Sequence, residues 1–245
     1  MVKNRELAGL IMKQSFFKQY LPIALALIFA VFMTARTIGM IGLTSIPTES
    51  MMPNYAANST IFTYNWATPS RNDVVTYYDT SIAVPNIRFA KRELSLGRII
   101  AFGGERLEIS QGRVLINGED SDHASNLLYF WEISKNDFSA NQPRFNALPI
   151  PPVDFLDSVL VAMEVPKAMD IQRFVPMHLF DIRIFGKGTD NIWGNSGANW
   201  TMNNFGPITI PKGCLFILGD NRHNTEDSRY RGFVAENDIV GKVLN

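Results

Sequence analysis

An uncharged apolar segment near the N-terminus constrains this chain more than any other feature. No charged residue occurs from Tyr20 to Thr34. A helix needs roughly 20 apolar residues to cross the hydrocarbon core of a bilayer. The segment approaches that length with Ala35 and reaches it with apolar residues from Leu10 to Phe17, whose flanking lysines can extend toward the interface. Because it is apolar on all sides rather than along one stripe, we expect a transmembrane helix, not a buried soluble one.

The residues before this segment predict its orientation. Residues 1–19 carry four basic side chains and one acidic side chain, Glu6. Positive charge before a span favours a cytoplasmic N-terminus, with the remainder of the chain outside. A cleaved signal peptide has a similar composition. Here, however, the basic N-terminal segment, residues 1–19, is long, and residues 33–36 make a poor small-x-small cleavage site. We therefore expect a single-pass protein of the cell inner or plasma membrane, in contact with the lipid bilayer. Its main domain would be extracytoplasmic, periplasmic in a Gram-negative cell.

Beyond the apolar segment, short strand patterns alternate with tight turns. Residues 60–64 and 73–78 have strand composition and are separated by the turn Pro69-Ser70-Arg71-Asn72. Farther on, Gln111-Gly112 separates two short apolar runs, and Asn117-Gly118 is a strong hairpin signal. This spacing predicts a mainly β fold with an antiparallel β-meander or twisted-sheet core, rather than alternating helices and strands.

The sequence pattern changes between residues 119 and 205. Periodicity fades there, prolines cluster and aromatic residues are spread among polar ones. We interpret residues 119–205 as an inserted β/loop subdomain. The predicted organisation is a basic tail and anchor at residues 1–36, a core formed by residues 37–118 and 206–245, and this insertion.

Composition excludes several classes of function. The formal net charge is zero, so nothing suggests a nucleic-acid partner. The three histidines and the single cysteine are scattered without metal-ligand spacing, and no glycine-rich phosphate loop occurs. We therefore predict no metal and no cofactor.

Two separated segments carry the most specific pattern. The first, residues 46–54, reads Ile-Pro-Thr-Glu-Ser-Met-Met-Pro-Asn, and the second, residues 219–229, reads Gly-Asp-Asn-Arg-His-Asn-Thr-Glu-Asp-Ser-Arg. Together they resemble the Ser-Met-x-Pro and Gly-Asp-Asn-Arg-x-x-Ser-x-Asp-Ser-Arg boxes of type I signal peptidases. Residues 71–75 resemble that family's Arg-Gly-Asp-Val-Val box, with Asn72 in place of the glycine. Asparagine tolerates left-handed backbone angles, so we expect this turn to persist.

The resemblance implies roles for individual residues. Ser50 would be the nucleophile, and the oxyanion would be held by the Ser50 backbone N–H and the hydroxyl of Thr48. Thr225 stands where the family has a serine that hydrogen-bonds the base, and Asp227 and Arg229 are expected to form an ion pair. The remaining residues expected to support the site are Asp220, Asn221, Arg222 and Ser228.

The catalytic base is the open question. In the family it is the lysine of a Lys-Arg box, and Gly97 stands at that position, followed by Arg98. Arginine cannot substitute, because its guanidinium stays protonated in proteins. Two alternatives remain: Lys91, in a displaced Lys-Arg pair, or His223 within the second box. We also expect a lysine at position 97 to be tolerated unless Gly97 has a positive φ or lies against another backbone.

The resemblance predicts a membrane-bound serine endopeptidase that removes signal (leader) peptides from exported preproteins. The peptide substrate is expected to add as a strand to a sheet edge flanking Ser50. Two alternatives stay open. One is a catalytically impaired homologue that acts as a binding or assembly factor for an exported protein or for a pilus or conjugation component, which Gly97 favours. The other is a dedicated processing peptidase of a conjugation or pilin system, which the retained Ser50, Thr225, Asp227 and Arg229 allow.

Overall fold

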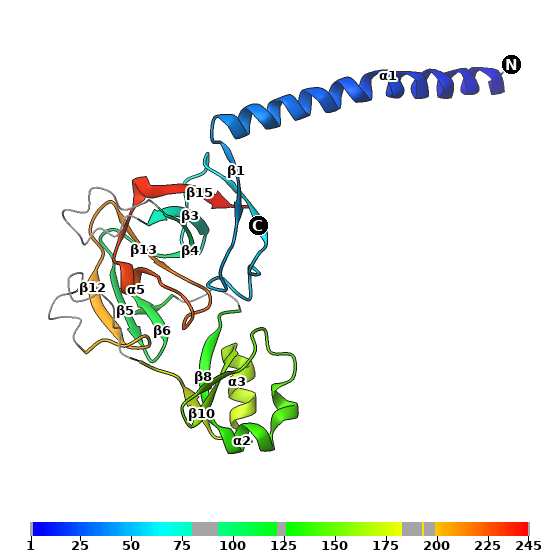
Figure 1. Cartoon of the computed structure of the whole chain (residues 1–245). Helices are drawn as coiled ribbons and strands as arrows, with labels where there is room; N and C mark the ends of the chain where they lie inside the picture. The colour runs from blue at the N-terminus through cyan, green and yellow to red at the C-terminus, as the bar shows by residue number, and fades with distance from the viewer. Residues whose placement is uncertain (1, 80–92, 122–125, 183–192, 194–198, 245) are drawn as a thin grey trace.

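A long N-terminal helix precedes the β domain in the computed structural model, which describes residues 2–79, 93–121, 126–182, 193 and 199–244. Helix α1 (Val2–Thr37) projects away from the rest of the chain (Figure 1). Its part from Lys18 to Thr37 is long and apolar enough to cross a membrane, and none of that part is buried inside the protein. The sequence prediction of an N-terminal apolar helix is therefore confirmed.

The largest sheet has seven antiparallel strands, in the order β1-β2-β15-β3-β4-β13-β14. In chain order they are β1 (Ile41–Ser45), β2 (Thr60–Tyr64), β3 (Val74–Asp79), β4 (Glu93–Phe102), β13 (Cys214–Leu218), β14 (Val234–Ala235) and β15 (Ile239–Val243). The predicted mainly antiparallel β fold is confirmed. The simple meander is interrupted, because C-terminal strands lie beside β2, β3 and β4. This interleaving brings the first and last parts of the domain together.

A second sheet has the order β12-β5-β6-β7. Its strands are β5 (Arg106–Ser110), β6 (Arg113–Ile116), β7 (Glu119–Asp120) and β12 (Phe205–Thr209). The predicted turns are confirmed: Gln111 and Gly112 both have positive φ, 50° and 80°, as do Asn117 and Gly118, 54° and 88°. Two consecutive positive φ values are what the favoured two-residue hairpin turn requires.

The two sheets share a buried apolar cluster. Phe205 of β12 and Phe216 of β13 are both at most 1% exposed, and their ring centroids lie 5.6 Å apart. Leu218, the last residue of β13, belongs to the same cluster and is fully buried. The segment that follows β13 therefore starts from a rigid position in the core.

The insertion contains a third sheet and its own core. Strands β8 (Tyr129–Ser134), β9 (Val153–Phe155), β10 (Ser158–Met163) and β11 (Met177–Leu179) have the order β11-β8-β10-β9. They pack with α2 (Lys135–Ala140), η1 (Gln142–Phe145) and α3 (Val165–Gln172), which lie at the end of the domain far from α1 (Figure 1). The exact domain boundaries stay a prediction.

The helices of the insertion were not expected from the sequence, which predicted strands and loops. Helix α2 forms because the side chain of Ser134 accepts a hydrogen bond from the Asp137 N–H at 3.1 Å, a standard N-cap. Helix α3 has a proline in its first turn, where a missing N–H costs little, and buries Ala168 and Ile171. Helices of six and eight residues are too short to produce a clear 3.6-residue periodicity.

Candidate active site

Ser50 lies in a turn that follows β1, here called the serine turn (residues 46–54). Ile46 and Met51 flank Ser50 and are 2% and 0% exposed, whereas Ser50 itself is only partly buried. Burial of these two neighbours fixes the turn and leaves the serine accessible. The Ser50 Oγ lies 3.0 Å from the Thr48 Oγ1, and either hydroxyl can be the donor. The structure therefore brings the predicted nucleophile and its predicted oxyanion partner together.

Residues 219–229, here called the C-terminal box, pack directly on the serine turn. A Cβ atom on Gly219 would lie 2.5 Å from Thr225 Oγ1 and 2.7 Å from the Ser50 backbone oxygen. Gly219 therefore permits a close approach of these two segments. At Gly232 the φ of 84° does show a turn, which ends α5 (Ser228–Arg231).

Hydrogen bonds join the two segments at several points. The Asn221 N–H donates to the Ser50 oxygen at 2.9 Å, and the Asn221 side chain donates to the Glu49 oxygen at 3.3 Å. Asn224 donates to the Glu49 carboxylate at 3.1 Å. The box thus holds the backbone on both sides of the Ser50 amide, where the proposed oxyanion donor lies.

Asp220 is a fully buried anchor for three segments. It accepts hydrogen bonds from Arg98 Nε at 2.7 Å, from Arg98 Nη2 at 2.5 Å and from Asn54 Nδ2 at 2.8 Å. Arg98 also donates to the oxygen of Asn72, whose φ of 68° confirms the predicted left-handed turn residue. Burial lowers the pKa of Arg98, but the hydrogen bonds and charge of Asp220 outweigh it and raise the pKa. Arg98 is therefore a fixed cation and not a base.

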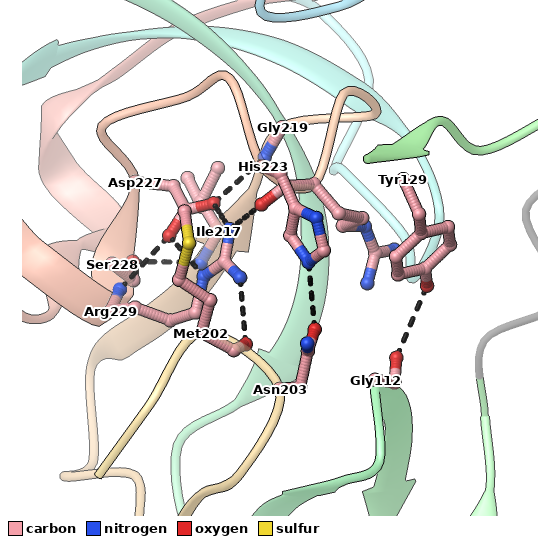
Figure 2. A network of polar contacts seen from close by, with 11 residues as sticks. Gly112, Tyr129, Met202, Asn203, Ile217, Gly219, His223, Asp227, Ser228 and Arg229 are labelled. Atoms are coloured by element: carbon pink, nitrogen blue, oxygen red, sulfur yellow. Dashed lines mark hydrogen bonds and ion pairs between the residues drawn. The ribbon is translucent and has the colours of Figure 1, made fainter. Parts of the chain in front are cut away.

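Asp227 and Arg229 form the predicted ion pair, and each is 2% exposed. Arg229 donates to both carboxylate oxygens, at 3.0 and 2.8 Å, and also to the backbone oxygens of Met202 and Arg222 (Figure 2). Burial alone would lower the pKa of Arg229, but Asp227 raises it. Ser228 accepts from the Ile217 N–H at 2.9 Å. These contacts fix the box to the core strand β13.

We expect loss of Asp227 to be strongly destabilising. Asp227→Ala leaves the buried Arg229 without its counter-charge, which typically costs about 3–5 kcal/mol in the free energy of unfolding. The measurement is urea unfolding of the full chain in detergent, followed by tryptophan fluorescence. Adding Arg229→Met should recover part of the loss, so strictly additive losses would show that the two side chains do not couple. The exposed pair of Glu226 with Arg231 is the control, and Glu226→Ala should change stability little.

The structure contradicts the hypothesis that His223 is the base. Its Nδ1 accepts from the Phe130 N–H at 3.0 Å, so Nε2 carries the proton and donates to Asn203 Oδ1 at 2.7 Å (Figure 2). The ring is 7% exposed and makes edge contacts with Tyr129, Phe130 and Phe180. Burial, together with the charge of Arg229, lowers the pKa of His223 to about 3. Both nitrogens are engaged, so His223 is a neutral structural residue.

This buried histidine predicts a loss of stability in acid. Between its ordinary pKa of 6.5 and about 3, only the unfolded chain binds a proton at residue 223. Stability should therefore fall as the pH drops through this window, by about 2 kcal/mol between pH 7.5 and pH 5 from this residue alone. His223→Gln should remove that part of the pH dependence in urea unfolding. His178→Gln, at an exposed histidine, should retain it, and equal slopes in both variants would contradict the assignment.

A cleft of about 640 Å³ opens at Ser50. The cleft is lined by residues 44–50, which include the end of β1 and the start of the serine turn, and by residues 93–96 of β4. Tyr77, Thr225 and Tyr230 also line it. Strand β13 pairs with β4 only from Arg98 onward, so among the described residues the edge of 93–96 that faces away from β3 has no strand partner. The cleft therefore joins a nucleophile-type side chain to an open strand edge.

Gly97 lies directly after this open edge, and the space around it is filled. A Cβ atom there would lie 2.4 Å from Ile217 Cγ2, 3.4 Å from the Leu218 oxygen and 3.6 Å from Tyr77 Cε1. Its φ is not positive. The expectation that a lysine fits at this position is therefore wrong, and the obstacle is chiefly a buried side chain rather than backbone strain.

Lys91, the other candidate base, lies outside the described residues. Among the described residues that line the cleft there is no lysine, and the one histidine is His223. Lys242 is held by Asp73, with 2.8 Å between Nζ and Oδ2, and does not line the cleft. The structure thus brings Ser50, Thr48 and Thr225 together without a described base.

Sequence reasoning missed two residues that fix the site. Asn54 ties the serine turn to Asp220, and its place directly after the Met-Met-Pro turn was a usable signal. Asn203 holds His223 and also donates to the Phe180 oxygen at 2.8 Å. Nothing local in the insertion marks Asn203, because its partners come from distant segments.

The fold and the site together define a mainly β protein, preceded by an apolar helix, that presents a serine at a cleft beside an open strand edge. This chain belongs to the signal peptidase family, peptidase S26, whose family model matches residues 16–244. It is 29% identical over 221 residues to a signal peptidase I of Buchnera aphidicola subsp. Baizongia pistaciae, covering 81% of this chain and 67% of the relative. It is also 22% identical over 203 residues to a signal peptidase I of Leptolyngbya laminosa, covering 81% of this chain and 64% of that relative.

The chain thus spans about two thirds of the length of these two curated relatives. A solved signal peptidase I structure from Enterococcus faecalis matches 74% of this chain and all of its own, at 18% identity and a TM-score of 0.34.

Proposed function

We propose that this protein is a membrane-bound signal peptidase that removes signal peptides from exported preproteins through attack by Ser50. The observation that carries the proposal is the Ser50 hydroxyl, 3.0 Å from that of Thr48, at a cleft that an open strand edge also lines. Family membership supports the reaction class, and the geometry supports the nucleophile.

The cleft suits an extended peptide. Residues 44–48 and 93–96 both line it, and a substrate strand bound there would pair with exposed backbone. The Ser50 Oγ would form a bond to the scissile carbonyl carbon, and the C–N bond would then break, with the serine proton passing through a base to the leaving amine. Water would hydrolyse the acyl-enzyme. The Ser50 N–H and the Thr48 hydroxyl would stabilise the oxyanion, and one such donor is typically worth about 10²–10³ in rate.

Lys91 remains our proposed base. The proposal is supported by elimination within the described lining of the cleft, where no lysine occurs and His223 is neutral with both nitrogens engaged. A lysine serves as a base only when its surroundings depress its pKa. Lys91→Ala should then remove cleavage activity.

A second candidate function is favoured by one observation. The family's lysine position is Gly97, and the Ile217 methyl group fills the space that a side chain there would need. A catalytically impaired homologue that binds an exported protein, or a pilus or conjugation component, would retain the cleft without a working base. A dedicated processing peptidase with one such substrate is a narrower version of the first function.

We also propose that α1 anchors the domain on the outer side of the membrane. Lys18–Thr37 is the candidate span, and basic residues precede it. Beyond the span, Ile38 and Trp66 are 63% and 60% exposed, which suits contact with lipid. Protease added to spheroplasts should digest the β domain but leave it intact in sealed inverted vesicles. The reverse pattern would contradict this orientation.

The test of the proposed function is direct. Purified full-length protein in detergent is incubated with a preprotein carrying an Ala-X-Ala cleavage region, and the products are sequenced from their N-termini. A single new N-terminus after the small-x-small sequence supports the peptidase. Binding of the preprotein without any cleavage would favour the impaired homologue, and neither binding nor cleavage would reject both functions.

A further inference from the structure

Tyr77 is a buried tyrosine that lines the cleft but has no role in the site described so far. It lies on β3, is 5% exposed, and its ring packs in the cluster that contains Val75, Ile99 and Ile217. Among the described residues its hydroxyl makes no hydrogen bond. The hydroxyl oxygen is not among the described buried polar atoms that lack a partner, so the polar end of the ring keeps access to the solvent in the cleft.

The hydroxyl end of the ring lies beside Gly97. A Cβ atom on Gly97 would be 3.6 Å from Tyr77 Cε1, and that carbon is bonded to the ring carbon that carries the hydroxyl. Because Gly97 has no side chain, nothing from this residue covers the polar end of Tyr77. Ser95 is the strand partner of Tyr77 on β4, and both residues line the cleft. The phenol therefore lies next to the open edge where the proposed peptide would pair.

The surroundings suit a hydrogen-bond donor. Burial, the charge of Asp79 and the charge of Asp227 raise the pKa of Tyr77 well above its usual range, although Arg231 opposes them. The side chain is therefore a neutral phenol at physiological pH. A neutral phenol can donate to a neutral carbonyl oxygen, the acceptor that the backbone of an extended peptide provides.

We propose that the hydroxyl of Tyr77 donates a hydrogen bond to a backbone carbonyl oxygen of the peptide bound in the cleft. Tyr77 would then be a recognition residue for extended peptides, and its contact would be independent of the peptide's side chains. This inference rests on the proposed function, because it requires that the cleft bind a peptide.

The experiment measures binding without turnover. Full-length protein with Ser50→Ala, in detergent, is titrated into a fluorescent synthetic signal peptide that includes an Ala-X-Ala region. Tyr77→Phe in this background should raise the Kd about 3- to 10-fold, the usual worth of one neutral hydrogen bond. The melting temperature should not fall, because the free protein loses no hydrogen bond. Tyr78→Phe, the next residue on the strand and on its opposite face, should leave the Kd unchanged.

Other outcomes would contradict the recognition role, the backbone acceptor or the proposed function. If Tyr77→Phe leaves the Kd unchanged, the recognition role of Tyr77 is wrong. The same holds if the Kd rises together with a fall in melting temperature. Neither result affects the proposed peptidase function. If Tyr77→Phe raises the Kd only for peptides with one particular polar side chain, the hydrogen bond goes to that side chain and not to a backbone carbonyl oxygen. A protein that binds no peptide even before Tyr77 is changed rejects the proposed function itself.

A second measurement needs no substitution in the molecule that is titrated. The ¹³Cζ resonance of Tyr77, in protein labelled at tyrosine, should shift when the signal peptide binds, because a new hydrogen bond forms at the attached oxygen. If Tyr77→Phe does not fold, this resonance decides the matter. A ¹³Cζ signal that stays in place at saturating peptide overturns the inference.

Discussion

Ser50→Ala is expected to abolish cleavage of a signal-bearing preprotein by the full-length protein in detergent. Ser50 lines the cleft and is our proposed nucleophile, and the C-terminal box holds its backbone oxygen at 2.9 Å from the Asn221 nitrogen. Alanine removes the attacking oxygen and leaves those backbone contacts in place. The expected loss is at least about 10³-fold, since loss of a covalent nucleophile removes the whole acyl-enzyme route. The measurement is the initial rate of product formation.

A matched variant separates chemistry from folding. Ser59→Ala changes a serine outside the cleft lining, on the loop that leads into β2, and should leave the rate close to that of the parent. Thr48→Val should fall between the two, because it removes one proposed oxyanion donor, worth about 10²–10³ in rate, and keeps the nucleophile. Cleavage that survives in both Ser50→Ala and Lys91→Ala would reject the serine–lysine mechanism.

The sequence predicted those parts of the fold and the site whose residues lie close together along the chain. The Asp227–Arg229 pair spans two residues along the chain, so the box itself specified it. The left-handed turn at Asn72 followed from the conformational tolerance of asparagine. Hairpin turns at Gln111-Gly112 and Asn117-Gly118 were equally local. In each case the physical cause lies within a few residues.

What sequence could not predict depends on distant partners. From sequence alone His223 looks like an ordinary loop residue. Burial against distant segments makes it a neutral ring, with Phe130, 93 positions away, and Asn203 bonded to its two nitrogens. The position of β15 between β2 and β3 is likewise a long-range pairing with no local signal. The space around Gly97 could not be predicted either, because its neighbour Ile217 lies on the adjacent strand β13, about 120 positions later in the chain.

This last contact determines how a lysine can be introduced at position 97. Gly97→Lys alone places a Cβ atom 2.4 Å from the Cγ2 of Ile217, which is fully buried and branched at Cβ, so it cannot swing aside. We expect overpacking to cost about 1–3 kcal/mol in the free energy of unfolding, with no gain in activity. Ile217→Ala removes the obstructing methyl group, whereas Ile217→Val keeps both branches at Cβ and is the matched control.

The double variant Gly97→Lys/Ile217→Ala distinguishes the enzyme from its impaired alternative. If the natural chain lacks a base, the parent is inactive. The double variant should then cleave the preprotein at least about 10²-fold faster, which is the usual contribution of a positioned base. Adding Ser50→Ala should remove that gain. Gly97→Lys/Ile217→Val should gain nothing, because the clash persists. If Lys91 is the base, the parent is already active, and a second lysine beside the first is neutral or harmful, since neighbouring positive charges compete for one site. Equal gains in the alanine and valine backgrounds would show that Ile217 does not obstruct the lysine, and the geometric argument for Gly97 would fail.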